Sequence, residues 1–218
     1  MIRLIKSDVV PHSLIVKGNT EYNYQDVQKQ LIDDHNDKCY VCERICVTDY
    51  EIEHLRSSTN HPELKTNWDN LFFSCKYCNG KKLHHFDNIL NPSLHNVEEI
   101  IQCNHLAATK SVSFDSTESD NPQVAETIRF LKRIFNGTGK MRVIKEERFY
   151  EYFLGRINNF SSVLDKYLYA KTNENKSIVI EELGIRQEFL SFKYHILKQR
   201  QDLFDEFAPY MVWNKIHN

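Results

Sequence analysis

Four cysteines arranged as two Cys-x-x-Cys pairs constrain this chain more than any other feature of its sequence. Cys39 and Cys42 form the first pair, Cys75 and Cys78 form the second, and 32 residues separate the pairs. A Cys-x-x-Cys turn presents two thiolates to one ion, so two such turns complete a tetrahedral zinc site with four cysteine ligands. A zinc ion bound this way has no open coordination position, and we therefore predict a structural role for it. The competing interpretation is two unrelated cysteine pairs.

The expected cellular location determines how the two remaining cysteines are interpreted. No apolar run in the 218 residues approaches the roughly 20 residues of a membrane span, and the first residues, MIRLIKSDVVPHSLIVKG, lack a secretory hydrophobic segment. We therefore expect a cytoplasmic location, where thiols stay reduced and disulfides are rare. Cys46 and Cys103 lie outside the two pairs, and we interpret them as small apolar packing residues.

Polar residues of a different kind lie between and beside the cysteine pairs. Glu53 and His54 are adjacent, Asn70 follows in WDNL, and Asn79 comes directly after Cys78. Imidazole titrates near neutral pH, so His54 is the candidate general base for hydrolysis of a phosphodiester bond. Glu53 and Asn79 offer the oxygen ligands that Mg²⁺ or Mn²⁺ prefers, and Asn70 is the candidate to hold the imidazole in orientation. Four further residues are candidate phosphate contacts: Arg56, Lys76, Lys81 and Lys82.

The order C-x-x-C, E-H, W-D-N-L, C-x-x-C-N-x-x-K resembles the HNH endonucleases, which have a ββα-metal fold with a zinc-knuckle frame. The resemblance covers about residues 39–86 and implies that His54, Asn70 and Asn79 stand at the H, N and last H of the family name. It implies a catalytic role for His54 and Asn70, and a catalytic divalent cation at Glu53 and Asn79. The chain departs from the pattern in having Glu53 where Asp is commoner and Asn79 at the last position.

A narrower resemblance extends over more of the chain. IRLIKSDVVPHSL at the start and ETIRFLKRIFN after two expected strands are similar to the PtuB family, the HNH subunits of Septu-type and retron-associated antiphage defence systems. This resemblance implies a PtuA-like ATPase as partner and nucleic acid, DNA or RNA, as substrate. The formal net charge of −2 agrees with that picture, because a nuclease that binds nucleic acid unaided is usually more basic.

Patterns of apolar residues predict the elements of an α+β fold. We expect helices over 24–35, 124–135, 149–168 and 186–207, a helix after Asn70 that carries the second cysteine pair, a short strand or hairpin over 47–54, a loop over 57–67, and strands in VEEIIQC and KSVSF. Pro209 should stop the last helix.

The expected organisation has four parts. They are an extended arm over 1–20, an HNH nuclease domain with the four-cysteine zinc site over 21–110, a linker over 111–121, and a mainly helical domain over 122–218 that docks the partner. The sequence thus predicts a metal-dependent endonuclease that acts as the effector subunit of an antiphage complex. The alternative is a zinc-stabilised binding or assembly module without catalysis, which would need the cysteines but not Glu53, His54, Asn70 and Asn79.

Overall fold

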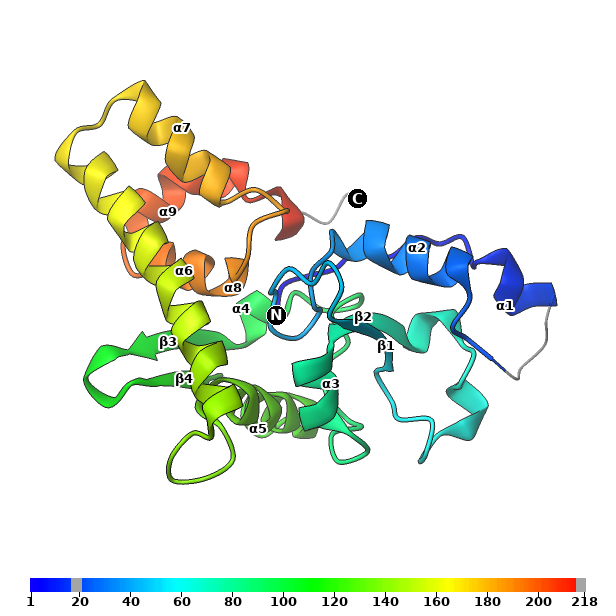
Figure 1. Ribbon diagram of the computed structural model, residues 1–218. Helices are drawn as coiled ribbons and strands as arrows, with labels where there is room; N and C mark the ends of the chain where they lie inside the picture. The colour runs from blue at the N-terminus through cyan, green and yellow to red at the C-terminus, as the bar shows by residue number, and fades with distance from the viewer. Residues whose placement is uncertain (17–20, 215–218) are drawn as a thin grey trace.

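The computed structural model describes residues 1–16 and 21–214, and it is a mixed α+β structure with two small sheets and a helical C-terminal part. The helices and strands are α1 (His12–Val16), α2 (Gln25–His35), β1 (Tyr50–His54), β2 (Leu71–Cys75), α3 (Lys76–Lys82), α4 (Val97–Ile100), β3 (Gln102–Leu106), β4 (Ser111–Asp115), α5 (Pro122–Asn136), α6 (Ile144–Tyr169), α7 (Asn173–Glu182), α8 (Leu190–Lys198) and α9 (Gln201–Phe207). Figure 1 shows α1, α2, the first sheet and α3 on one side, with α7 to α9 on the other.

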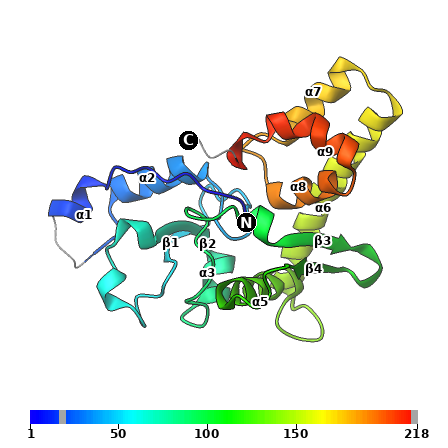
Figure 2. The same cartoon turned by 180° about the vertical axis from the view of Figure 1, so that it is seen from behind.

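The first sheet pairs β1 with β2 in antiparallel register, so that Glu53 lies opposite Phe72 and His54 opposite Leu71. It lies between α2 and α3, an arrangement visible from both sides in Figures 1 and 2. All five residues of β2 are buried, as expected of an apolar run covered on both faces. The predicted helix after Asn70 is therefore wrong in its first part, because residues 71–75 form a strand before α3 begins.

The second sheet is the hairpin β3–β4, which packs against α5 and α8. The strand predicted in KSVSF is confirmed as β4, but the strand predicted in VEEIIQC begins only at Gln102, after α4. Val97 and Ile101 are both buried, and their spacing of four residues fits a helical turn rather than a strand. Glu98 adds a tertiary contact, since its Oε2 accepts a hydrogen bond from the Arg3 amide at 2.9 Å.

The C-terminal half is helical, as predicted, with two differences in detail. The helices over 124–135 and 149–168 are confirmed as α5 and α6, whereas α7 was not predicted. The single helix expected over 186–207 is wrong: Arg200 has an extended backbone (φ −132°, ψ 107°) and separates α8 from α9. Gly137 ends α5 with a positive φ of 83°, and a Cβ there would collide with the carboxylate of Glu146.

One hydrophobic core joins the two halves of the chain. It contains the cysteines together with Phe135, Phe153 and Phe192, while a second core lies around Phe160 and Phe207 at the far end of α6. The aromatic stripes of α5 and α6 are therefore largely buried. A linker and a domain boundary at 111–121 stay predictions, although residues 111–115 form β4.

Polar contacts reinforce this junction. Lys38 Nζ donates to the Gln187 carbonyl at 3.0 Å, and the Ile45 amide donates to Glu188 Oε1 at 2.8 Å. Tyr77 of α3 donates its hydroxyl to the Ile134 carbonyl of α5 at 2.8 Å. The segment around the cysteines thus rests directly on the C-terminal helices.

The N-terminal arm is more ordered than the sequence indicates. It includes α1, so the expectation of an entirely extended arm is wrong for residues 12–16, and residues 17–20 lie outside the described part. Lys6 Nζ donates to the Leu71 carbonyl at 2.8 Å and lies 4.1 Å from the centre of the Trp68 ring. Across residues 1–16 and 21–214, no helix is both long and apolar enough to cross a membrane.

Candidate functional site

Cys39, Cys42, Cys75 and Cys78 come together in the structure. All four are buried, and their sulfur atoms lie within 4.8 Å of one another. The Sγ atoms of Cys42 and Cys75 are 3.8 Å apart. In a tetrahedral site with Zn–S bonds of about 2.3 Å, neighbouring sulfur atoms are separated by about 3.8 Å. The four thiols are therefore close enough together to bind one zinc ion.

Local structure places the second cysteine pair. Cys75 ends β2 and is the N-cap of α3, where its Sγ accepts a hydrogen bond from the Cys78 amide at 3.4 Å. Contacts with the Cys39 and Cys42 thiols lower the pKa of the Cys75 thiol, whereas burial raises the pKa of the Cys42 and Cys78 thiols. Cys46 and Cys103 are buried but lie outside this group.

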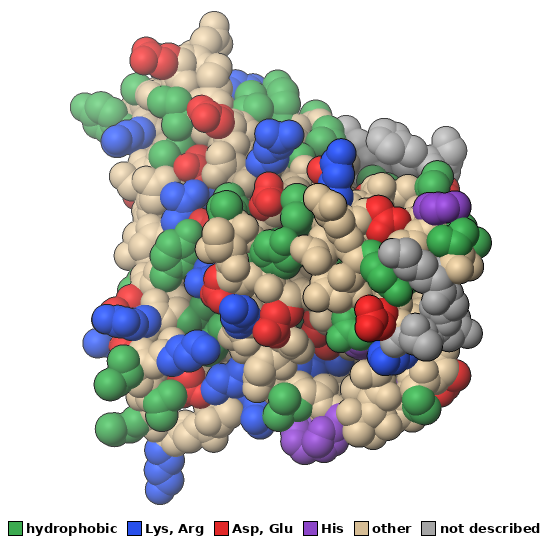
Figure 3. Space-filling model, turned by 45° about the vertical axis from the view of Figure 1, so that its right-hand side comes forward, with side chains coloured by type: hydrophobic (Ala, Val, Ile, Leu, Met, Phe, Trp, Pro, Cys, Tyr) green, Lys and Arg blue, Asp and Glu red, His purple; other side chains and the backbone are tan. Residues whose placement is uncertain are grey.

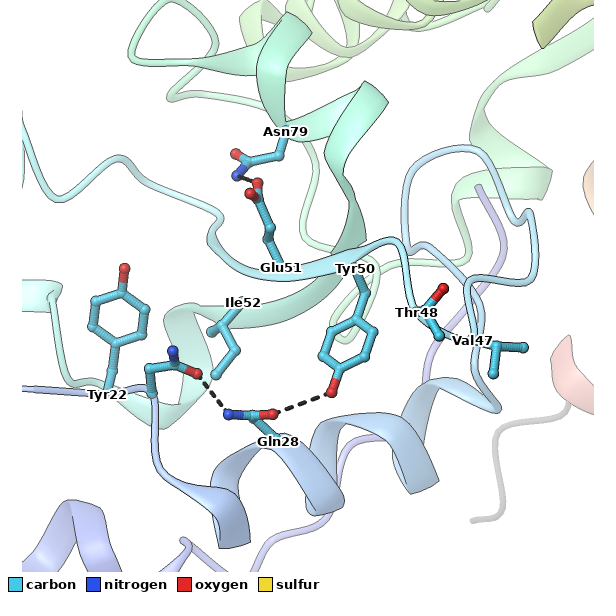
Figure 4. Close-up of a pocket in the computed structure, with 9 residues that line it drawn as sticks. Tyr22, Gln28, Val47, Thr48, Tyr50, Glu51, Ile52 and Asn79 are labelled. Carbon is cyan, nitrogen blue, oxygen red and sulfur yellow. Dashed lines mark hydrogen bonds between the residues drawn. The ribbon is translucent and has the colours of Figure 1, made fainter.

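Polar contacts between side chains connect β1 with α3. Lys82 Nζ lies 2.9 Å from Glu53 Oε1, and Asn79 Nδ2 lies 2.5 Å from Glu51 Oε2. The pairs form because Glu51 and Glu53 share one face of the strand and Asn79 and Lys82 share one face of the helix. Figure 4 shows Asn79 reaching from α3 to Glu51 on β1.

Glu53 is almost completely enclosed by these contacts. Its side chain is 5% exposed, its Oε2 accepts a hydrogen bond from the Tyr40 hydroxyl, and its Oε1 faces Lys82. Desolvation raises the pKa of the Glu53 carboxyl, and the Lys82 ammonium opposes that rise. Neither oxygen of Glu53 is free, and Asn79 contacts Glu51 instead. The predicted cation ligands Glu53 and Asn79 therefore do not form a ready-made pair here.

The structure also shows which of the four candidate phosphate contacts are buried or already paired. Lys82 is 0% exposed and additionally donates to the His54 carbonyl at 2.8 Å, so it cannot meet a phosphate on the surface. Lys81 is half-buried and forms an ion pair with Glu146. Lys76 is exposed, and the Arg56 guanidinium donates to the Asp87 carbonyl at 2.9 Å.

His54 is the last residue of β1, and one hydrogen bond determines the tautomer of its neutral ring. Its Nε2 lies 2.8 Å from the carbonyl oxygen of Lys65, which can only accept, so Nε2 carries the proton in the neutral ring. Nδ1 is then the basic nitrogen. The Tyr22 ring meets the imidazole edge-on, with ring centres 4.5 Å apart. Burial lowers the pKa of His54, and so does the charge of Lys82, whereas the Lys65 carbonyl opposes the shift.

The Asn70 side chain forms hydrogen bonds with the backbone of the loop that contains the Lys65 carbonyl. Its Oδ1 accepts a hydrogen bond from the Arg56 amide at 2.8 Å, and its Nδ2 donates to the carbonyls of Arg56 and Leu64 at 2.9 Å and 3.2 Å. Leu64 precedes Lys65, so the Asn70 side chain fixes the backbone beside the carbonyl that orients His54.

A small cavity brings Glu53, His54 and Asn79 to a common surface, whereas Asn70 is buried outside its walls. The cavity has a volume of about 210 Å³, and Glu53, His54, Asn79 and His84 contribute to its walls. We call it the His54 cavity. A larger hollow of about 700 Å³ adjoins it, because Tyr22, Ile52 and Asn79 line both. Figure 4 shows this hollow, with Glu51, Tyr50 and Gln28 in its walls.

Sequence reasoning missed three contributors to this site. Glu51, Tyr40 and Tyr22 were not singled out, although Glu51 carries a signal that could have found it. A strand places residues two apart on one face, so Glu51 shares the face of Glu53. Nothing in the local sequence of Tyr22 or Tyr40 indicates that these residues meet β1.

Comparison with known proteins finds a partial relationship. No family model matches the chain. The Septu protein PtuB of Bacillus thuringiensis is 36% identical to it over 85 residues, which are 35% of this chain and 32% of that protein. The alignment thus spans about a third of the length of the curated relative. The chain is weakly homologous to a Septu protein, and its four buried cysteines fit a zinc-binding site.

Proposed function

We propose that this protein is a metal-dependent HNH endonuclease that hydrolyses phosphodiester bonds of nucleic acid. The observation that carries the proposal is the His54–Lys65 contact, which leaves Nδ1 of a neutral imidazole as the proton acceptor beside a cavity. A lowered pKa keeps that imidazole in its basic form at neutral pH.

Each residue of the proposed mechanism has one task. His54 takes a proton from water at Nδ1 as that water attacks phosphorus, the bond from phosphorus to the leaving ester oxygen breaks, and that oxygen takes a proton from solvent. The Lys65 carbonyl holds the ring through Nε2, and Asn70 holds the loop that contains the carbonyl. We therefore assign His54 a catalytic role and Asn70 a positioning role.

A divalent cation, Mg²⁺ or Mn²⁺, would supply charge against the developing phosphorane. The proposed ligands are Asn79 and Glu53, on the resemblance to HNH enzymes. Glu53 would have to give up Lys82 or Tyr40 to bind an ion, whereas Glu51 already lies beside Asn79. Glu51 is therefore the competing carboxylate. Comparison of Glu51→Gln with Glu53→Gln in a Mg²⁺ titration of cleavage separates the two.

The homology to a Septu protein supports a biological setting for this activity. We propose that the chain is the effector subunit of an antiphage defence complex and that a PtuA-like ATPase is its partner. The C-terminal part, residues 122–218, is the proposed docking region. Because much of its apolar surface packs on the first half, the docking surface must use residues other than the buried stripes.

The alternative is a zinc-stabilised assembly module without catalysis. The enclosure of Glu53 by Lys82 and Tyr40 favours it, since these contacts would serve a purely structural ion pair. Catalysis by His54 is the property that distinguishes the two functions.

The test is a cleavage assay on the purified full-length chain, alone and with its ATPase partner. Duplex DNA, single-stranded DNA and tRNA are offered with Mg²⁺. We expect cleavage by the parent and a loss of about 10²- to 10⁴-fold in His54→Ala, the usual contribution of a general base. His61→Ala is the matched control, because His61 lies in the loop between β1 and β2 and its Nδ1 is 3.4 Å from Glu63 Oε1, outside the His54 cavity. Equal cleavage by His54→Ala and the parent would leave the assembly module as the better interpretation.

A further inference from the structure

A groove beside α5 carries positive charge that the proposed active site does not use. It has a volume of about 480 Å³, and its walls include Arg129, Lys132 and Arg133 from one face of α5, with His85 from the segment after α3. We call it the α5 groove. In Figure 3, Lys and Arg side chains gather on the lower part of the face shown, next to histidine side chains.

The charge of this groove contrasts with the rest of the chain. No Asp or Glu is among the described residues that line it, although the whole sequence has a net charge of −2. Glu126 pairs with Arg129 at 3.2 Å, but the Arg129 side chain is 66% exposed, and such surface pairs contribute little. Three cations at i, i+3 and i+4 of a helix repel one another, so the arrangement favours an anionic ligand.

The guanidinium groups of Arg129 and Arg133 lie over one aromatic ring. The Phe86 ring centre lies 5.4 Å from the Arg129 guanidinium carbon and 5.9 Å from that of Arg133. Phe86 itself is buried and packs on Phe130, with ring centres 4.9 Å apart. The contacts with Phe86 thus hold both guanidinium groups beside the α5 groove.

The α5 groove and the His54 cavity lie next to each other, because consecutive residues contribute to their walls. His84 lines the cavity and His85 lines the groove, and their ring centres are 4.1 Å apart. Asn60 holds this segment from the other side, since its Nδ2 donates to the His84 carbonyl at 3.1 Å. An extended polyanion that places one phosphate at His54 can therefore continue past His84 and His85 onto α5.

We propose that the α5 groove binds the phosphate backbone of the nucleic acid next to the phosphate that is cleaved. This inference rests on the proposed nuclease function and extends the substrate surface beyond the ββα segment. A nucleic-acid backbone fits better than a single anion, because several cations line a groove that adjoins the proposed active site. Guanidinium groups that lie over an aromatic ring also suit bidentate phosphate contacts.

The experiment measures binding rather than cleavage. In a full-length His54→Ala background, dye-labelled duplex and single-stranded oligonucleotides are titrated against the triple variant Arg129→Gln, Lys132→Gln, Arg133→Gln. The matched control removes the same charge elsewhere through Lys29→Gln, Lys166→Gln and Lys171→Gln, all on exposed side chains. A double variant, Arg129→Gln with Lys132→Gln, covers the case in which the half-buried Arg133 is needed for folding.

We expect at least a tenfold loss of affinity in the groove variant and little change in the control. The slope of log K against log salt should fall by about 2 to 3, one unit for each lost phosphate contact. Equal affinities of groove and control variants would overturn the proposal, as would equally tight binding of polyglutamate of the same charge. Groove-dependent binding without cleavage by the parent would overturn only the nuclease function, and cleavage insensitive to the groove variant would overturn only the groove.

Discussion

The ammonium group of Lys82 lies 2.9 Å from the carboxylate of Glu53, and both side chains are almost completely buried between β1 and α3. A buried ion pair is sensitive to the loss of one partner, because the remaining charge has neither water nor a counterion. The pair therefore joins the strand that ends in His54 to the helix that carries Asn79.

Replacement of Lys82 by Met should destabilise the protein by about 3–5 kcal/mol. The double variant Lys82→Met, Glu53→Gln should recover most of that loss, since it removes both charges. Urea unfolding with intrinsic fluorescence measures both. Lys76→Met is the matched control on the exposed side of α3, and a change within about 0.5 kcal/mol is expected there. If Lys82→Met behaved like Lys76→Met, the ion pair would not be what joins β1 and α3.

The four-cysteine group should bind one zinc ion on which folding depends. Cys39→Ser or Cys78→Ser should abolish zinc in elemental analysis and lower the free energy of unfolding by several kcal/mol, because metal binding and folding are coupled. Cys103→Ser is the control, since Cys103 is buried away from the group and its loss should leave zinc content unchanged. Well-folded protein that contains no zinc would contradict this prediction.

Replacement of Asn70 by Asp should lower both the stability of the protein and the rate of cleavage. In Asn70→Asp a carboxylate would face the carbonyls of Arg56 and Leu64 in place of the donating amide, which should cost about 1–3 kcal/mol and slow cleavage. Asn67→Asp is the matched control, because the Asn67 side chain accepts a hydrogen bond, from the Asp69 amide at 2.9 Å, and a carboxylate can do the same. Thermal melting and cleavage rates report the two effects, and equal behaviour of both variants would remove Asn70 from its positioning role.

His35 should make stability depend on pH. Burial lowers its pKa to about 3, with smaller contributions from the charges of Lys6 and Lys38, and its Nε2 accepts a hydrogen bond from the Phe73 amide. The unfolded chain, in which the pKa is about 6.5, takes up the proton first, so stability is complete above that pH and is lost as the pH falls toward 3.

The expected loss from this residue is about 2 kcal/mol between pH 7 and pH 5. His35→Gln, which keeps an acceptor for the Phe73 amide, should show a smaller drop over that interval by about this amount. Denaturant unfolding at the two pH values measures the difference. An identical pH dependence in parent and variant would show that folding does not lower the pKa of His35.

The sequence alone predicted the features that depend on residue type and on spacing along the chain. The spacing of the two cysteine pairs predicted one metal-binding group, and the structure brings the four sulfur atoms together. The periodic apolar residues of α5 and α6 predicted those helices, since an amphipathic stripe repeats along the chain. The α+β class came from the apolar patterns, and the candidate set of Glu53, His54, Asn70 and Asn79 came from residue chemistry together with the resemblance to HNH endonucleases.

Contacts between distant segments were decided only by the tertiary structure. Whether Lys82 faces water or Glu53, and whether Asn79 meets Glu53 or Glu51, depends on how α3 rotates against β1, which no local pattern specifies. The break between α8 and α9 and the shared core of the two halves depend in the same way on packing partners far away in the chain. Local spacing fixes which residues can reach one another along an element, whereas burial and pairing are set by the opposing surface, and that surface comes from elsewhere in the sequence.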